Sequence, residues 1–299
     1  MVLSRDAWYV GPVKSRLQTV LLFVDGLGLG PEHEGNPVFS GACPRLARLL
    51  REQAVPVDAG LGVPGLPQSA TGQTALLTGV NAPVLVGRHV EGLPGPRLKE
   101  VVRGINLLKS LVARGYRATF ANAYFTSDVE EIRSRRHQSV TTVAALAAFG
   151  AVRMTDDLLA GRAVYQDLTR RSLRERGYDG PLVTPAQSAR DLLALAGEHD
   201  FTLFEYFQTD RAGHKGNPEF TRRVLGEFDE FLAGVLEFAE GEDRLFLMTS
   251  DHGNIEDAST RTHTANPVPL VALGAHAAEL RSKVRCLIDI MPALLDLYA

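Results

Sequence analysis

Acidic and histidine side chains gather in the last third of this 299-residue chain. Five potential metal ligands fall between residues 210 and 263: Asp210, His214, Asp251, His252 and His263. Carboxylate oxygens and imidazole nitrogens bind divalent ions such as zinc or manganese without any thiolate. The cluster therefore predicts a metal site.

A short loop earlier in the chain offers hydroxyl groups that such a site could use. Ser69 and Thr71 lie in Pro67-Gln-Ser-Ala-Thr-Gly-Gln73, just before a predicted helix. Two metal ions about 3.5–4 Å apart can clamp the attacking and leaving oxygens of a phosphoryl transfer, and a coordinated hydroxyl becomes a better nucleophile. A helix N-terminus also favours anions. Either residue could be the nucleophile, or could simply cap the helix.

Apolar runs that end in glycine or polar residues predict the elements that must position these groups. They alternate with helical patterns, which is typical of an α/β fold with a mostly parallel sheet and helices on both faces. The predicted strands are Thr19–Val24, Ala118–Ala123, Phe201–Phe207, Leu245–Thr249 and Val268–Leu273. The predicted helices are Pro44–Val55, Gln73–Thr78, Val101–Arg114, Val143–Phe149, Ala189–Ala196, Phe220–Ala239 and Ile288–Leu297.

Three aspartates come soon after predicted strands. Asp25, Asp210 and Asp251 follow the runs that end at Val24, Phe207 and Thr249. In open α/β sheets, ligands bind outside the carboxyl ends of the strands. We therefore expect the three carboxylates to meet at one edge of the sheet, although they lie far apart in the sequence.

Composition limits the remaining possibilities. A hydrophobic content of 45% and a charged content of 22% are ordinary for a folded domain, and we expect residues 1–299 to form a single metalloenzyme domain. The net charge of −3 gives no support for nucleic-acid binding, and no apolar run is long enough to span a membrane. Two cysteines without paired spacing, Cys43 and Cys286, fit a reducing compartment. The N-terminus lacks a leader pattern, so a cytoplasmic location is expected.

Several segments together resemble a known family. They are Leu22-Phe-Val-Asp-Gly-Leu-Gly28, Ser69-Ala-Thr-Gly72, Thr209-Asp-Arg-Ala-Gly-His214, Ser250-Asp-His-Gly-Asn254, His263-Thr-Ala-Asn-Pro-Val-Pro269 and Asp289-Ile-Met-Pro292. In this order they resemble the alkaline phosphatase superfamily, in the branch of cofactor-independent phosphoglycerate mutase and phosphopentomutase. The resemblance covers roughly residues 19–80 and 200–298.

The resemblance implies a role for each matching residue. One ion would be held by Asp210, His214 and His263. The other would be held by Asp25, Asp251 and His252, with Ser69 beside it. Ser69 would take up a phosphoryl group and release it, and it is preferred over Thr71 because Gly72 follows three residues later, as in the mutase motif. The cofactors would be two divalent ions, manganese or zinc, with magnesium also possible.

The sequence departs from the mutase pattern in three ways. Ala70 and Gln73 stand where the mutase motif has Glu and His. Only residues 85–195, approximately, separate the two metal-binding halves, so this stretch must hold both a reduced cap and part of the sheet. The mutase's substrate arginines cannot be matched; the candidate anion contacts here are Arg88, His89, Arg97, Arg103, Arg133, Arg135, Arg136, His137 and Arg153.

These observations favour a metal-dependent phosphoryl hydrolase or transferase that acts on a small phosphorylated metabolite through a phosphoserine. A phosphomutase acting on a phosphoglycerate or sugar phosphate is the first alternative, and a phosphodiesterase is the next. A catalytically inactive metal-binding protein is the alternative from a different class, although a complete ligand set with a nucleophile argues against it.

Overall fold

The computed structural model describes residues 17–299, so the N-terminal segment on which the leader prediction rests lies outside the described residues. A six-stranded sheet runs through the middle of the molecule, in the order β2-β6-β5-β1-β4-β3. Neighbouring strands are parallel except for β6, which runs antiparallel to both β5 and β2. The strands are β1 (Gln18–Val24), β2 (Ala54–Val57), β3 (Ala118–Phe120), β4 (Phe201–Tyr206), β5 (Arg244–Thr249) and β6 (Val268–Gly274).

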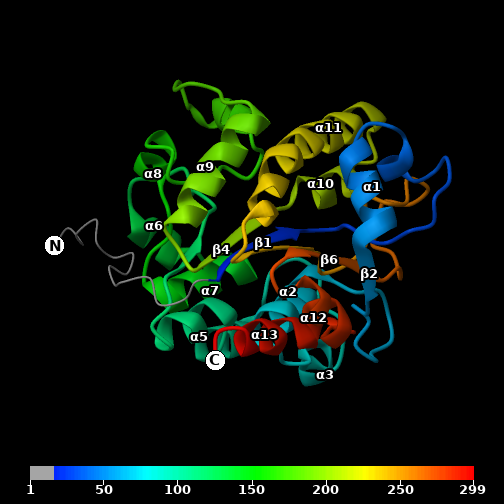
Figure 1. The fold of residues 1–299 in the computed structure, drawn as a ribbon, viewed down its shortest axis with the longest axis horizontal. Coiled ribbons are helices and arrows are strands. Elements are labelled where there is room, and N and C mark those ends of the chain that lie inside the picture. Colours follow the sequence, from blue (N-terminus) through cyan, green and yellow to red (C-terminus); the bar gives the residue numbers. More distant parts are fainter. Residues whose placement is uncertain (1–16) are drawn as a thin grey trace.

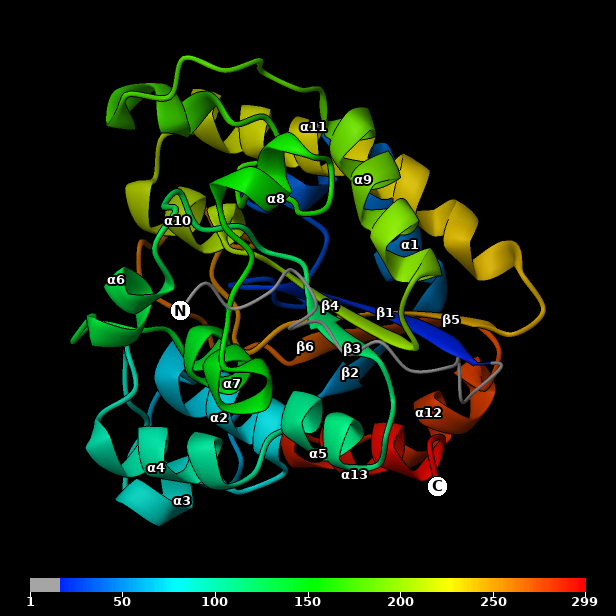
Figure 2. The ribbon, with the colours of Figure 1, turned by 90° about the vertical axis from the view of Figure 1, so that its left-hand side faces the viewer.

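Helices cover both faces of this sheet (Figures 1 and 2). One face carries α1 (Pro44–Gln53), α9 (Pro185–Gly197), α10 (Gln208–Lys215) and α11 (Pro218–Val235). The other face carries α2 (Ser69–Thr78), α3 (Ala82–Val86), α4 (Pro96–Gly104), α5 (Leu107–Ala113), α7 (Val140–Phe149), α12 (Ala277–Lys283) and α13 (Leu287–Asp296). The short helices α6 (Val129–Ser134) and α8 (Thr155–Leu159) and the 3-10 helices Pro37–Phe39, Arg171–Arg176 and Leu236–Glu240 complete the described chain.

Strand β1 explains why the core has two halves. Its side chains alternate between the faces, so Leu21 and Phe23 pack with α2, α5 and α13, while Val20 and Leu22 pack with α1, α9 and α11. Both sets are almost fully buried. Burial on both faces explains why the sequence of this strand is an unbroken apolar run.

The α/β prediction with a mostly parallel sheet is confirmed, while several element boundaries differ from the sequence prediction. The helix predicted at Pro44–Val55 ends at Gln53, and the chain turns directly into the edge strand β2, which the sequence analysis missed. The helix predicted at Val101–Arg114 is two helices, α4 and α5, because the Asn106 side chain accepts a hydrogen bond from the Lys109 N–H and starts a new helix. Helix α2 begins at Ser69, four residues before the predicted start.

Among residues 17–299, no helix is long and apolar enough to cross a membrane. Cys43 is buried and donates to the carbonyl of Val38 at 3.2 Å, and burial raises the pKa of its thiol to about 12. Such a thiol stays protonated and has a structural role.

Candidate active site

The central strands bring the predicted ligands to one edge of the sheet. Strand β1 lies between β4 and β5, and Val24 pairs with Tyr206 while Phe23 pairs with Thr249, so the three strands end level with one another. The Asp25 N–H donates to the Tyr206 carbonyl at 2.9 Å. Because β6 is antiparallel, its amino end lies at this same edge, and His263 precedes it. The predicted ligands therefore lie at one edge of the sheet, as the strand ends indicated.

Asp210, His214 and His263 form one group of potential metal ligands, with one atom from each residue lying within 4.8 Å of the other two. Asp210 and His214 lie one helical turn apart on α10, on the same side of the helix. The Nε2 atom of His214 lies 3.3 Å from Asp210 Oδ1 and 3.1 Å from Nε2 of His263. This is the trio that the family resemblance assigns to one ion.

A second group of ligand atoms surrounds Nε2 of His252. Asp25 Oδ1 lies 3.2 Å from this nitrogen, Asp251 Oδ2 lies 3.6 Å from it, and Ser69 Oγ lies 2.9 Å from it. Atoms of Asp25, Asp210 and His252 also fall within 4.8 Å of one another, so Asp210 lies within reach of both groups. The family resemblance assigns Asp210 to the first group alone.

Backbone carbonyls orient all three imidazoles. Nδ1 of His214 faces the Arg261 carbonyl at 2.8 Å, Nδ1 of His263 faces Pro67 at 2.9 Å, and Nδ1 of His252 faces Gly253 at 3.3 Å. A carbonyl only accepts, so Nδ1 carries the proton in each ring and Nε2 is turned toward the site. Outer hydrogen bonds of this kind are how proteins orient metal-binding histidines.

Unsatisfied buried oxygens also fit a cation. Asp25 Oδ1 and Asp251 Oδ2 are buried without a hydrogen-bond partner in the part of the chain that the structure describes. Burial and the neighbouring charge of Asp251 raise the pKa of Asp25 well above its usual range. Burial alone would lower the pKa of His252, but the carboxylates of Asp251 and Asp25 outweigh burial and raise it to about 10. A bound cation would replace that proton and satisfy the carboxylates.

Ser69 is the first residue of α2, and its hydroxyl belongs to the second ligand group. Thr71 is fully buried: its Oγ1 donates to the Gln68 carbonyl at 3.1 Å and accepts from the Val90 N–H at 3.2 Å. The two hydroxyls that the sequence left as alternatives therefore have different surroundings. Only that of Ser69 contacts the ligand cluster.

Gln73, one helical turn after Ser69, donates through Nε2 to Asp25 Oδ2 at 3.1 Å. This residue stands where the mutase motif has His. The hydrogen bond fixes one oxygen of Asp25 and leaves Oδ1 to face His252. Asn254 also positions an aspartate, since its Nδ2 donates at 2.7 Å to Asp210 Oδ1, the oxygen that faces His214.

Glu256 is a buried carboxylate that the sequence analysis missed. Its Oε2 accepts from the N–H groups of Gly28 at 3.0 Å and Asn254 at 2.8 Å, and its Oε1 accepts from Thr264 and from Asn266. It thus joins the three loops that carry Asp25, His252 and His263. In the sequence, Glu256 directly follows Asp251-His-Gly-Asn-Ile255. This position alone does not predict its role, because its hydrogen-bond partners come from other loops.

A cavity of about 520 Å³ opens beside these groups. Ser69, Asp25, Gln73 and Asp210 lie at its metal-ligand side, and Glu205 and several aromatic side chains line its walls. Burial raises the pKa of Glu205 to about 7, and Thr141 donates to its Oε2 at 2.5 Å. This volume lies within the usual range of small-molecule sites in proteins.

Two of the basic residues considered from the sequence, Arg135 and His137, line this cavity. A further basic residue that lines the cavity, Arg176, is not among the candidates named from the sequence. The Arg176 guanidinium lies 5.5 Å from the centre of the Phe125 ring. No sequence pattern predicts that Arg176 lines the cavity, because only the tertiary fold brings it there. Arg153 is buried in the fold, where it donates to Thr119 Oγ1 at 2.9 Å and to the Arg162 carbonyl at 2.8 Å. The other basic candidates do not line the cavity either.

Comparison with known proteins agrees with this geometry. The family model described as the Metalloenzyme superfamily matches residues 18–298. The chain belongs to this superfamily. The metalloenzyme is also similar to 2,3-bisphosphoglycerate-independent phosphoglycerate mutases. Identity is 36% over 87 residues with that of Methanococcus vannielii (29% of this chain, 21% of the relative) and 32% over 123 residues with that of Desulforudis audaxviator (38% and 24%).

These matches cover about a quarter or less of the relatives' own length. Solved structures share the fold over nearly the whole metalloenzyme. The alkaline phosphatase of the Antarctic bacterium TAB5 superposes with a TM-score of 0.54 at 13% identity, covering 94% of this chain and 97% of that one. The alkaline phosphatase of Thermus thermophilus superposes with a TM-score of 0.56 at 12% identity, covering 98% and 95%. The metalloenzyme thus has an alkaline phosphatase-like fold, and part of its sequence is similar to phosphoglycerate mutases.

Proposed function

We propose that this metalloenzyme removes a phosphoryl group from a small phosphorylated metabolite, with Ser69 as the nucleophile. The observation that carries the proposal is the position of Ser69 Oγ, 2.9 Å from Nε2 of His252 and at the wall of the 520 Å³ cavity. Two divalent ions, held by the two ligand groups, would supply charge neutralisation for the phosphoryl oxygens and lower the pKa of the Ser69 hydroxyl.

The chain's own residues account for the rest of the step. The Ser69 hydroxyl loses its proton to solvent and its Oγ attacks phosphorus. The bond from phosphorus to the substrate's oxygen then breaks, and that oxygen takes a proton from solvent and leaves as the alcohol. The positive end of the α2 dipole faces the charge that collects beside Ser69. Water then attacks the phosphoserine and releases inorganic phosphate, which restores the free Ser69 hydroxyl.

We propose that residues 85–195, which also supply β3 and helices packed on the sheet, contain a reduced cap over this site. Arg135, His137 and Arg176 line the cavity from this segment, and they suit an anionic group of the substrate. His137 and Arg176 are exposed and Arg135 is half-buried, so this wall is open to solvent. An open wall favours hydrolysis, because a mutase must keep water away from its phosphoserine while the intermediate reorients.

The second candidate function is a phosphomutase, and the named relatives favour it. The phosphoglycerate mutase of Methanococcus vannielii shares 36% identity with part of this chain. A compact cap could still close over a substrate of the size that the cavity admits.

One incubation separates these candidates. The enzyme, loaded with manganese or zinc, is mixed with phosphoglycerates, pentose phosphates and a generic aryl phosphate. Inorganic phosphate and positional isomers are then followed together. We expect phosphate release from at least one substrate, and loss of that release in Ser69→Ala. Rapid interconversion of isomers with negligible phosphate would replace hydrolysis by the mutase function, and no turnover at all would support the inactive metal-binding alternative.

A further inference from the structure

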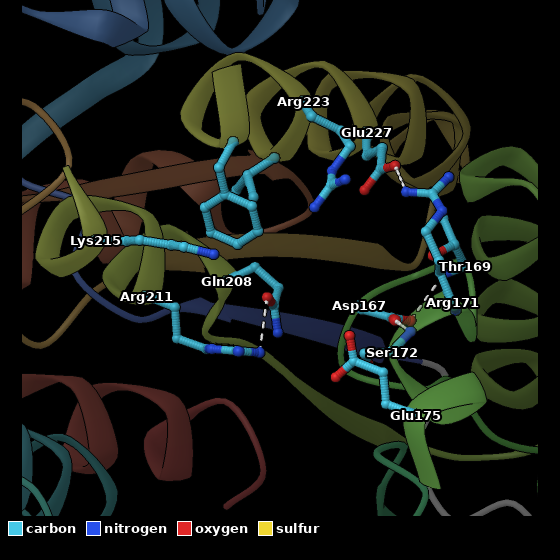
Figure 3. A pocket seen from close by; sticks show the side chains of 12 residues that line it. Asp167, Thr169, Arg171, Ser172, Glu175, Gln208, Arg211, Lys215, Arg223 and Glu227 are labelled. Atoms are coloured by element: carbon cyan, nitrogen blue, oxygen red, sulfur yellow. Dashed lines mark hydrogen bonds and ion pairs between the residues drawn. The ribbon is translucent and has the colours of Figure 1, made fainter. Parts of the chain in front are cut away.

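A second cavity, of about 290 Å³, lies between α10, α11 and the segment that contains Asp167 and Arg171 (Figure 3). It is separate from the cavity that holds Ser69. Gln208 lines this second cavity and Gln166 lines the first, and the Nε2 of Gln208 donates to the Oε1 of Gln166 between them. A ligand in the second cavity would therefore have its own contacts.

Three cations line one half of this cavity. Arg211 and Lys215 extend into it from α10, and Arg223 reaches in from α11 (Figure 3). Lys215 Nζ lies 4.6 Å from the centre of the Phe220 ring, and the Arg223 guanidinium carbon lies 5.1 Å from the same centre. One aromatic ring thus holds two like charges close together.

These three cations form no ion pair with a carboxylate anywhere in residues 17–299. The interaction seen for Arg211 is a hydrogen bond from Nη1 to Gln208 Oε1 at 3.2 Å. Like charges gathered in a concave site repel one another and raise the local positive potential, and an anion relieves both effects.

The acidic side chains across the cavity do not neutralise these cations, because none of them forms an ion pair with Arg211, Lys215 or Arg223 among residues 17–299. Asp167 accepts from the N–H groups of Thr169, Arg170 and Ser172, at 3.0, 2.7 and 2.7 Å. Glu227 is paired with Arg171 at 2.6 Å. Glu175 lies across the cavity from the cations (Figure 3). The cationic half is therefore left to face a ligand from solvent.

We propose that Arg211, Lys215 and Arg223 form an accessory site for phosphate, either free or as the phosphoryl group of a small molecule. Arginine and lysine both donate charge-assisted hydrogen bonds to phosphate, and here they approach from two helices. A tetrahedral dianion can accept from several directions at once, which a planar carboxylate does less well. The proposal does not depend on the reaction proposed for Ser69.

The test is a calorimetric titration of the full, metal-loaded chain with inorganic phosphate. Arg223→Gln and Lys215→Gln should each weaken one binding event by about fivefold or more. Arg222→Gln is the matched control, since this neighbouring arginine is exposed on α11 and does not line the cavity. Arg135→Gln should leave the same event unchanged, because Arg135 lines the reaction cavity.

Phosphate binding that Arg223→Gln and Lys215→Gln leave unchanged would overturn the proposal. Equal weakening by Arg222→Gln would also overturn it, because it would show general charge attraction. A parallel titration with succinate tests the ligand class, and succinate binding more tightly than phosphate would contradict the phosphate assignment. Binding at the Ser69 site is a separate event, so a failure of the proposed reaction would not affect this result.

Discussion

The Oγ atom of Ser69 lies 2.9 Å from Nε2 of His252, and Asp25 Oδ1 lies 3.2 Å from that same nitrogen. Ser69 opens α2, while Asp25 and His252 follow the adjacent strands β1 and β5. A hydroxyl, an imidazole and a carboxylate from three distant segments therefore converge on one point. This relationship underlies both the metal assignment and the choice of nucleophile.

Single histidine substitutions should remove different ions. We expect His263→Ala to lose the ion held with Asp210 and His214, and His252→Ala to lose the ion held with Asp25 and Asp251. Each variant should keep about one ion per chain in elemental analysis after dialysis, against about two for the unmodified protein. Exposed His276→Ala serves as the control. A crystal structure of His263→Ala that lacks the ion beside Asp251 and retains the other would contradict the grouping.

Gly72→Ala should disturb the packing that places Ser69 against the ligand loops. A Cβ at Gly72 would lie 2.7 Å from the Asp251 carbonyl oxygen and 3.0 Å from Asp251 Cβ, so the helix or the loop must move. Overpacking of this kind costs about 1–3 kcal/mol. We expect that loss in urea unfolding, together with a lower kcat.

Gly104→Ala is the matched control for that variant. Gly104 is also helical, in α4, but a Cβ there meets nothing within 4 Å. Since alanine favours a helix over glycine, it should be neutral or stabilise the fold by up to about 1 kcal/mol. Similar destabilisation in both variants would show that contact with Asp251 is not the cause.

His199 should make stability depend on pH. Burial lowers the pKa of this imidazole from 6.5 to about 4 in the folded protein. The unfolded chain therefore binds the extra proton first, so stability falls as the pH drops from about 6.5 toward 4. This term amounts to about 2 kcal/mol between pH 7 and pH 4.5.

His199→Asn removes that titration and can still donate toward the Leu195 carbonyl, which Nδ1 of His199 contacts at 2.8 Å. Urea unfolding of the variant at the two pH values should show a loss of stability smaller by about 2 kcal/mol. Exposed His33→Asn should retain the full pH dependence. Identical pH dependence in His199→Asn and the unmodified protein would refute this assignment.

Much of the site could be predicted because its ligands follow apolar strands. Asp25 and Asp251 come directly after β1 and β5, and parallel strands bring such residues to one edge. Asp210 and His214 share a face of α10 through their spacing alone. The sequence pattern carries these relationships, since each depends on local geometry plus the direction of the strands.

Other features could not be predicted because they depend on tertiary contacts. Strand β2 is four residues long and contains Pro56, so its sequence does not distinguish it from the end of the preceding helix. Only its pairing with β6 identifies it as a strand. Arg153 is a candidate anion contact from the sequence, yet the fold buries it against Thr119. Glu256 joins loops that are remote in sequence. Arg176 lines the cavity beside Ser69 only because the tertiary fold brings residues 165–176 to it.

The most direct test of the central claim is to locate the phosphoryl group during turnover. The metal-loaded enzyme is mixed with a substrate that it hydrolyses and is quenched in acid within the first turnovers. The protein is then digested and its peptides are mapped by mass spectrometry. The account predicts one added phosphoryl group on Ser69, absent from Ser69→Ala, whereas Thr71→Ala still acquires it. A phosphoryl group on Thr71, or turnover by Ser69→Ala at the rate of the unmodified enzyme, would contradict the account.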